Sequence, residues 1–143
     1  VRLKGAYYIK YVSHETDENG NITVVHCTYD PESFGGETPD GRKVKGTLHW
    51  VSAKNSIPFE ARLYDRLFVN PNPSDESNGD FTNNLNPDSL EILEGCLIEG
   101  GIKDVKCGDT FQFMRQGYFC VDTTSTEDKT VFNRTVDLKS SWK

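Results

Sequence analysis

The chain has 143 residues, which is enough for one ordinary domain or for two small barrels. No apolar run approaches the roughly 20 residues that a membrane-spanning helix needs, so the sequence predicts no such helix. The net charge of −6 counts against nucleic-acid binding, but residues 1–72 hold nine basic and nine acidic side chains, whereas residues 73–143 hold seven and thirteen. The balanced first half can still present a basic face, because attraction to phosphate depends on the local potential.

The strand-forming residues Val, Ile, Tyr, Phe and Thr recur in short runs between turn residues, a pattern that predicts an all-β protein. The predicted strands span residues 2–12, 22–29, 43–51, 61–69, 89–97, 110–114, 118–122 and 130–137. Asn19-Gly20 lies between the first two strands and predicts a hairpin, since both residues tolerate a positive φ.

Three connections stand out between the predicted strands. Residues 31–41 form an exposed loop that contains two Gly-rich turns. Residues 52–59 have room for one helical turn, which Pro58 would end. Residues 71–86 are polar and rich in Asn, Asp, Ser and Pro, and we expect them to be mobile because they bury too little apolar surface. Strands this short, with no room for helical crossovers, predict antiparallel sheets that close into barrels.

The beginning of the chain carries no initiator Met and no apolar signal segment. We therefore expect the chain to be a piece of a longer protein. Its four cysteines lack zinc-ribbon spacing, and Cys27 and Cys120 lie in apolar runs, where we expect small buried hydrophobes. The three histidines are far apart and lack supporting Cys or carboxylate spacing, so we expect no metal site.

Several ordered blocks of the sequence resemble one known family. They read GRKVKGTLHWVSAK at residues 41–54, RLYDRLF at 62–68, FQFMRQGYFCVD at 111–122 and VFNRTV at 131–136. In this order they are similar to the C-terminal anticodon-binding region of the glutaminyl-tRNA synthetases, over nearly the whole chain. The resemblance implies two small barrels, the distal one inserted in the proximal one. Residues 1–54 correspond to the distal barrel and residues 55–143 to the returning part of the proximal barrel, which would be incomplete and would expose apolar surface or pack against another copy.

The resemblance also implies four anticodon-binding residues. Arg2 and Lys4 match a Val-Arg-Leu-Arg motif, although Lys4 replaces an arginine and loses the planar two-pronged donor. Gln112 and Arg115 match a Phe-Gln-Phe-x-Arg motif that is implied to act at the middle anticodon base. From the residues alone, Arg2, Lys4 and Gln112 are equally explained as the solvated face of a strand.

Other charged and aromatic residues allow two interpretations each. Arg42, Lys43 and Lys45 form a basic cluster that either contacts the tRNA backbone or is ordinary surface charge. Arg134 either contacts the tRNA backbone or pairs with nearby carboxylates. We expect Trp50 to be a core residue. Asp65 lies between Arg62 and Arg66, and we expect it to form an ion pair with one of them.

The function implied by the resemblance is tRNA anticodon recognition within a cytoplasmic glutamine–tRNA ligase that uses ATP and magnesium. Both nucleotide-binding motifs of class I synthetases are missing from these 143 residues, so we expect no catalytic residue, cofactor or aminoacylation from this piece alone. Two alternatives remain: the similar region of a glutamyl-tRNA synthetase, and a non-catalytic β-barrel that binds other proteins, which the acidic composition favours. A small hydrolase that pairs Asp65 with Glu60 is a weaker third, because nothing positions a nucleophile.

Overall fold

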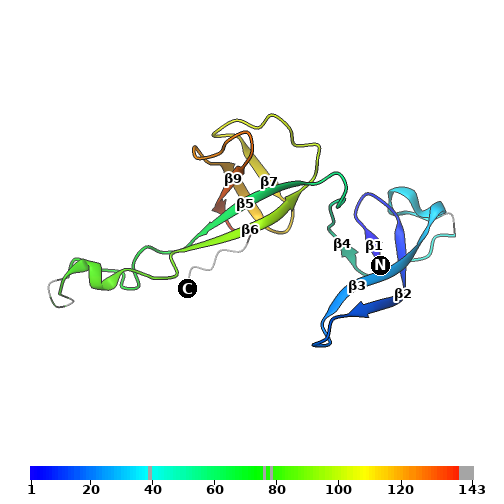
Figure 1. The fold of residues 1–143 in the computed structure, drawn as a ribbon, viewed down its shortest axis with the longest axis horizontal. Helices are drawn as coiled ribbons and strands as arrows, with labels where there is room; N and C mark the ends of the chain where they lie inside the picture. The colour runs from blue at the N-terminus through cyan, green and yellow to red at the C-terminus, as the bar shows by residue number, and fades with distance from the viewer. Residues whose placement is uncertain (39, 76, 78, 139–143) are drawn as a thin grey trace. The chain divides into compact units, whose positions relative to one another are not determined.

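A computed structural model describes residues 1–38, 40–75, 77 and 79–138 of the chain. The chain forms two compact units, Val1–Trp50 and Val51–Lys143, each built around its own sheet (Figure 1). The division falls after Trp50, slightly before the expected boundary at residue 54. Strands dominate both units, which confirms the predicted all-β class. Among the described residues there is no helix with the length and apolar character needed to cross a membrane.

The first unit contains a four-stranded sheet in the order β3-β2-β1-β4. Its strands are β1 (Arg2–Leu3), β2 (Tyr8–Thr16), β3 (Ile22–Asp30) and β4 (Thr47–Leu48), and a 3-10 segment, η1 (Pro31–Gly36), follows β3. The predicted hairpin between β2 and β3 is confirmed: Gly20 has a φ of 83°, and Asp17 accepts hydrogen bonds from the backbone N–H groups of Asn19 and Asn21.

Two predicted strands of the first unit are much shorter in the structure. The expected strand over residues 2–12 is interrupted by a turn in which Gly5 has a φ of 70°, and the strand expected over residues 43–51 is reduced to β4. The reason is local backbone geometry: at Gly5, and at Gly46 with a φ of 86°, the chain leaves the extended conformation and turns.

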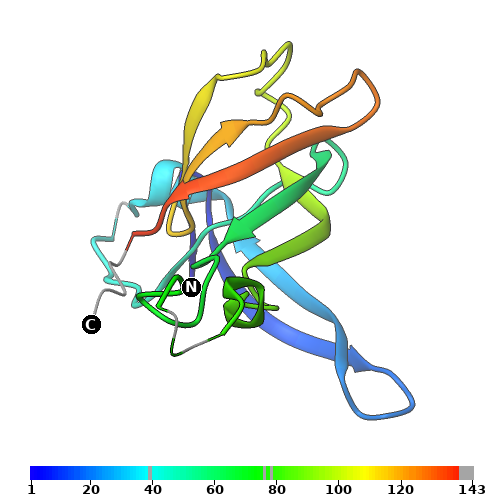
Figure 2. The same cartoon turned by 90° about the vertical axis from the view of Figure 1, so that its left-hand side faces the viewer.

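The second unit contains a five-stranded sheet in the order β6-β5-β9-β8-β7. Figure 2 shows β9 (red) between β5 (green) and β8 (orange). The strands are β5 (Ile57–Tyr64), β6 (Leu90–Ile98), β7 (Thr110–Phe113), β8 (Gly117–Val121) and β9 (Thr130–Val136). A single turn with a hydrogen bond from Ser56 N–H to the Ser52 carbonyl precedes β5, but the strand continues through Pro58, which does not end it.

The expectation of purely antiparallel sheets is wrong at two places. β1 pairs in parallel with β4, and β5 pairs in parallel with β9. A parallel pair needs a long connection, not necessarily a helix. Here β6, β7 and β8 occupy the connection from β5 to β9, so the chain returns to β5 in the same direction.

The core of the second unit is an aromatic cluster centred on Phe132, which is 1% exposed. Its ring lies edge-on to the rings of Phe59, Phe111 and Phe113, with centroid separations of 5.3, 5.9 and 5.1 Å. Phe119 stacks on Phe113 at 4.4 Å. These rings come from β5, β7, β8 and β9, so the cluster joins four of the five strands.

A long excursion connects β5 to β6 and extends beyond them as an arm (green in Figure 1). Within it, Phe68 pairs with Leu85, and the 3-10 segment η3 (Phe81–Asn84) packs the Phe81 ring against that of Phe68, 6.4 Å away. The tract expected to be irregular over residues 71–86 therefore contains a short 3-10 segment, and contacts with Phe68 hold its C-terminal part. Its mobility remains a prediction, and residues 76 and 78 lie outside the described part.

Two predictions about buried residues are wrong. Trp50 is 45% exposed and Cys27 is exposed. Both lie in the first unit, whose sheet leaves much of its apolar surface uncovered by the rest of that unit: Tyr11, Val25 and Tyr29 are each more than half exposed. An apolar sequence run therefore did not identify a covered face here.

Candidate nucleic-acid interface

Arg2 lies on the two-residue strand β1, opposite Tyr8 of β2. The Nη2 group of Arg2 donates a hydrogen bond to the Tyr8 hydroxyl at 3.1 Å, and the guanidinium carbon lies 5.4 Å from the centre of the Tyr8 ring. The Nε atom of Arg2 is buried and has no hydrogen-bond partner in the described structure. Arg2 is therefore held in one orientation, unlike the freely solvated side chain of an edge strand.

Lys4 follows β1 and lies in the turn that precedes β2. Its backbone N–H donates to the Leu48 carbonyl, and its own carbonyl accepts a hydrogen bond from the Trp50 indole at 3.1 Å. The Lys4 side chain is exposed. The turn is thus anchored by its backbone to the β4 region, which fixes where the ammonium group leaves the surface.

A hollow of about 450 Å³ brings Arg2 together with two members of the predicted basic cluster. It is lined by Arg2, Tyr8, Gly36, Glu37, Thr38, Gly41, Arg42, Lys43 and Val44. Three cationic side chains and one carboxylate therefore surround it. Such a set suits an anionic or acceptor-rich ligand.

The basic cluster is not uniform. Arg42 forms ion pairs with Asp30 and with Asp40, the latter at 3.2 Å between Nε and Oδ2. Lys43 and Lys45 are exposed. Ordinary surface pairing thus accounts for Arg42 in this structure, whereas the two lysines present their charge to solvent.

Gln112 and Arg115 lie close together at the β7–β8 hairpin. Gln112 is exposed and pairs with Tyr118 across the hairpin, with its neighbours Phe111 and Phe113 packed on the core. Arg115 is at the tip, and its φ of 66° is rare for residues other than Gly, Asn and Asp. The structure therefore brings the predicted amide and guanidinium to one end of one hairpin.

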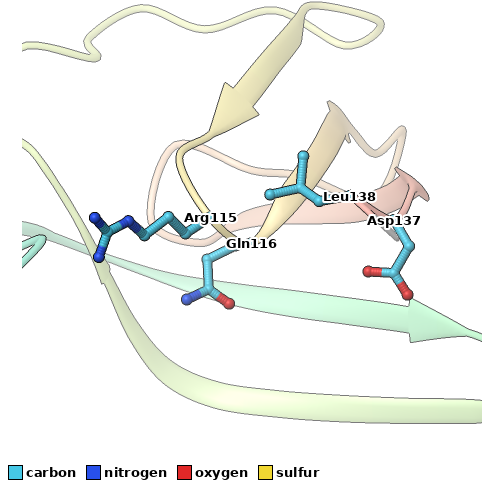
Figure 3. Close-up of a pocket in the computed structure, with 4 residues that line it drawn as sticks. All are labelled: Arg115, Gln116, Asp137 and Leu138. Carbon is cyan, nitrogen blue, oxygen red and sulfur yellow. The ribbon is translucent and has the colours of Figure 1, made fainter. Parts of the chain in front are cut away.

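A second hollow, of about 500 Å³, lies beside this tip and is lined by Arg115, Gln116, Asp137 and Leu138 (Figure 3). Figure 3 shows the Arg115 side chain extending away from Asp137. Arg134 of β9 instead pairs with Asp137, at 3.5 Å between Nη1 and Oδ1. Arg134 was expected either to contact the tRNA backbone or to pair with a carboxylate, and in this structure it pairs with the carboxylate of Asp137.

The second unit also contains an ionic network that the sequence did not reveal. Arg62 Nε lies 2.8 Å from Glu60 Oε1 and its Nη1 lies 3.6 Å from Asp122 Oδ1, while Lys129 Nζ lies 2.6 Å from Glu60 Oε2. Asp122 also accepts a hydrogen bond from the Asn133 amide. The spacing of Glu60 and Arg62, two residues apart on one strand face, was the available signal.

The network keeps its carboxylates ionised. Hydrogen bonds from the Thr124 side chain and backbone, with a further one from Asn133, lower the pKa of Asp122 to about 2. The hydrogen bond from Lys129, followed by that from Arg62, lowers the pKa of Glu60. A carboxylate held in this way by two cations is an ion-pair partner rather than a general acid, so the geometry does not support the hydrolase interpretation.

The predicted pairing of Asp65 with its flanking arginines is wrong. Arg62 is directed to Glu60 and Asp122, and Asp65 Oδ1 accepts the backbone N–H of Arg66 at 2.7 Å. Side chains at neighbouring positions of a strand point to opposite faces, and Asp65 lies just beyond the end of β5. The partners of Arg62 come instead from its own strand and from the segment after β8.

The predicted interface residues thus form two groups, one in each unit. The first unit holds Arg2, Lys4, Arg42, Lys43 and Lys45, and the second holds Gln112, Arg115 and Arg134. The two groups differ in character: the first is cationic, and its Arg2, Arg42 and Lys43 line a hollow, whereas in the second Gln112 and Arg115 place an amide and a guanidinium on one hairpin.

Comparisons with known proteins identify the family of this chain. Residues 47–122 match the family described as tRNA synthetases class I (E and Q), anti-codon binding domain. The chain is 52% identical over 142 residues to a glutamine–tRNA ligase from Proteus mirabilis, and 51% and 50% identical over 143 residues to those of Escherichia coli and Vibrio parahaemolyticus. Each match covers 99% of this chain but 25% of the relative. The chain therefore spans about a quarter of the length of these relatives.

The family match covers more than half of the chain and includes β5 to β8 with the Gln112–Arg115 hairpin. The expected resemblance is confirmed: this chain belongs to the family of anticodon-binding domains of the class I tRNA synthetases for glutamate and glutamine.

Proposed function

We propose that this chain is the anticodon-binding part of a glutamine–tRNA ligase. In that role it binds the anticodon loop, while the remainder of the enzyme activates glutamine with ATP and transfers it to the tRNA. The observation that carries the proposal is the identity of about half of the residues, over 99% of the chain, to proteins named glutamine–tRNA ligase. The family description includes glutamyl enzymes, but these relatives favour glutamine as the amino acid.

The chemistry of the two residue groups supports anticodon recognition. Sequence-specific RNA readers act mainly on unstacked bases, which they bind through stacking and through hydrogen bonds to base edges. Gln112 offers an amide that both donates and accepts, as the Watson–Crick edge of a pyrimidine requires. Arg115 offers a planar guanidinium at the same hairpin tip, suited to stacking or to a phosphate.

The first group is proposed to contact the same tRNA. Arg2 is the base-reading candidate because it is fixed by Tyr8, whereas Lys4, Lys43 and Lys45 supply charge toward the phosphates. We assign Arg42 and Arg134 secondary roles at the backbone, since each already has carboxylate partners. A lysine reads charge better than base identity, so the expected contribution of Lys4 is uniform across anticodons.

The other partners follow from the same proposal. ATP and magnesium are assigned to the three quarters of the enzyme outside this chain, and the location is the cytoplasm. We also propose a surface through which the chain packs against another protein segment. It is the outer strand β6, where Leu90, Ile92 and Leu97 are 41–50% exposed. This apolar edge suits either the rest of the proximal barrel or, as predicted from the sequence, a second copy.

Aminoacylation by the full-length protein tests the proposal. Gln112→Ala and Arg115→Ala should lower discrimination between a glutamine tRNA and transcripts with one altered anticodon base by roughly tenfold to a hundredfold, as expected for a lost base-edge contact. ATP–pyrophosphate exchange, which reports glutamine activation, should change little. Lys103→Ala, an exposed lysine on a loop of the same unit, is the control. Unchanged anticodon preference in both variants would contradict these roles.

A further inference from the structure

The side chain of Arg2 lies in a bracket made by Tyr8 and Gly36. The Tyr8 hydroxyl accepts a hydrogen bond from Arg2 Nη2 at 3.1 Å and donates one to the Gly36 carbonyl at 2.8 Å. Its ring lies beside the guanidinium, 5.4 Å from the centroid to Cζ. One hydroxyl thus joins the arginine to the backbone at the end of η1.

Tyr8 is itself immobilised. It is 6% exposed, and its backbone N–H donates to the hydroxyl of Ser33 at 2.8 Å. Ser33 is fully buried, and its hydroxyl donates in turn to the Asp30 carbonyl at 2.6 Å. The phenol that holds Arg2 is therefore tied to both β3 and η1, so it offers a rigid reference point rather than a flexible neighbour.

Gly36 leaves little room beside the Arg2 side chain. A Cβ atom at this position would lie 3.0 Å from Arg2 Cδ and 3.3 Å from Nε, and the φ of Gly36 is +90°. A side chain here would be in tight contact with Arg2, so the arginine would have to shift by a few tenths of an ångström. The absence of a side chain at Gly36 therefore creates the space through which Arg2 passes.

The bracket leaves a donor of Arg2 unused. Among the residues that the structure describes, the buried Nε has no partner, although buried donors are nearly always hydrogen-bonded, and Arg2 lines the hollow that also contains Arg42 and Lys43. Because Nε is buried, it is not the atom that meets a ligand. A guanidinium held in one orientation beside this hollow is prearranged for a ligand oxygen, and prearrangement reduces the entropy lost on binding.

We propose that Tyr8 is a positioning residue for RNA recognition: through its hydroxyl, and with the space left by Gly36, it fixes the guanidinium of Arg2 for an acceptor oxygen of a bound tRNA nucleotide. This inference rests on the proposed function, because it takes Arg2 as a tRNA contact. The acceptor is an oxygen of a base edge or of a phosphate, two sources that share one chemistry.

Tyr8→Phe is the central test because it removes one hydroxyl and keeps the ring. With the full-length protein and a glutamine tRNA transcript, Arg2→Ala is expected to raise Kd roughly tenfold to a hundredfold. Tyr8→Phe should raise it about fivefold or more, while Arg2→Ala with Tyr8→Phe should be no weaker than Arg2→Ala alone. This non-additivity distinguishes positioning from a general structural effect, and thermal midpoints verify that each variant is folded.

A matched glycine pair provides the second measurement. Gly36→Ala and Gly35→Ala place an alanine at similar backbone angles, φ +90° and +81°, but a Cβ at Gly35 meets no atom within 4 Å. Both substitutions place a side chain at a positive φ, so only Gly36→Ala should weaken tRNA binding beyond what its loss of stability, compared with that of Gly35→Ala, explains. Equal binding by the two variants would count against the bracket.

The outcomes separate the inference from the function on which it rests. Weak binding by Arg2→Ala with normal binding by Tyr8→Phe would overturn the positioning role and leave the tRNA contact intact. Normal binding by Arg2→Ala would overturn both. Transcripts with altered anticodon bases identify the acceptor: a base oxygen predicts a loss of discrimination in Tyr8→Phe, whereas a phosphate predicts the same fold-loss for every transcript.

Discussion

Lys129 and Glu60 form an ion pair, with Nζ 2.6 Å from Oε2, at the point where β9 begins alongside β5. Glu60 lies on β5 opposite Val131, and Lys129 directly precedes β9. These two strands are the parallel pair of the second unit, and their ends are far apart in the sequence. The ion pair therefore links segments that no tight turn holds together.

The same network predicts a loss of stability in acid. The pKa of Asp122 is lowered to about 2 in the folded chain from 3.8, so its contribution to stability is complete above about pH 4 and declines as the pH falls toward 2. Glu60, whose pKa is also lowered, adds to this loss below its ordinary value of 4.5. Denaturant unfolding between pH 7 and pH 2 measures the effect.

Asp122→Asn should reveal which part of this acid loss belongs to Asp122. The variant should be less stable than the parent at pH 7, and the difference should shrink as the pH approaches 2, where the parent carboxylate is itself becoming protonated. Asp88→Asn, at an exposed position outside the network, is the control. A difference that stays constant from pH 7 to pH 2 would show that the charge of Asp122 is not what stabilises the fold.

Phe132→Ala should strongly destabilise the second unit. The ring is 1% exposed and contacts three other phenylalanines, so truncation leaves a cavity that four strands border. The expected loss in the free energy of unfolding is about 3–5 kcal/mol. Val136→Ala, on the same strand but 56% exposed, should cost far less. Similar losses from the two substitutions would contradict the location of the core.

Trp50→Phe should cost little stability, in contrast to the expectation of a core tryptophan. The ring is 45% exposed, and its polar contact is the hydrogen bond from the indole to the Lys4 carbonyl at 3.1 Å. Phenylalanine keeps an aromatic ring but cannot donate, so the expected loss is about 0.5–1.5 kcal/mol. Thermal unfolding of the two proteins measures it. A loss as large as that of Phe132→Ala would restore Trp50 to the core.

The sequence predicted the strand content and the family, but it predicted pairings and burial less well. The β2–β3 hairpin at Gly20 follows from local turn chemistry and was predicted from a short window of sequence, whereas for β7 and β8 the two strands were predicted but not the turn between them. The parallel pairing of β5 with β9 depends on how distant segments assemble, which strand propensity does not encode. Burial failed at Trp50 and Cys27 because an apolar run does not say whether another element covers it.

The predicted interface shows the same division. Gln112 and Arg115 come from one sequence motif and lie on one hairpin, so the sequence alone brings them close together. The bracket around Arg2 was missed because it joins Tyr8 and Gly36 from separate elements, and no motif relates them. Likewise, the ion pair between Arg42 and Asp30 joins the loop before β4 to the end of β3, and the sequence did not predict it. Arg2 and Arg42 are held by contacts with distant segments, whereas Lys43 and Lys45 are exposed. The type of residue alone does not predict this difference.

Salt dependence of tRNA binding should distinguish these two kinds of cation. Lys43 and Lys45 are exposed, so phosphate contact by either one releases counterions from the RNA. Alanine at each position should reduce the slope of log Kd against log salt by about 0.7–1 per lost contact. The measurement is tRNA affinity of the full-length protein over a series of salt concentrations.

Arg42→Ala should change that slope less than either lysine substitution, because Asp30 and Asp40 already neutralise the guanidinium in the free protein. Binding phosphate through Arg42 would first require these ion pairs to break, and the released carboxylates would repel the RNA. Lys10→Ala, an exposed lysine on β2, supplies the baseline for losing one positive charge outside the hollow. If Arg42→Ala reduces the slope as much as Lys43→Ala does, Arg42 exchanges its carboxylates for phosphate on binding, and its pairing in the free protein does not limit its role.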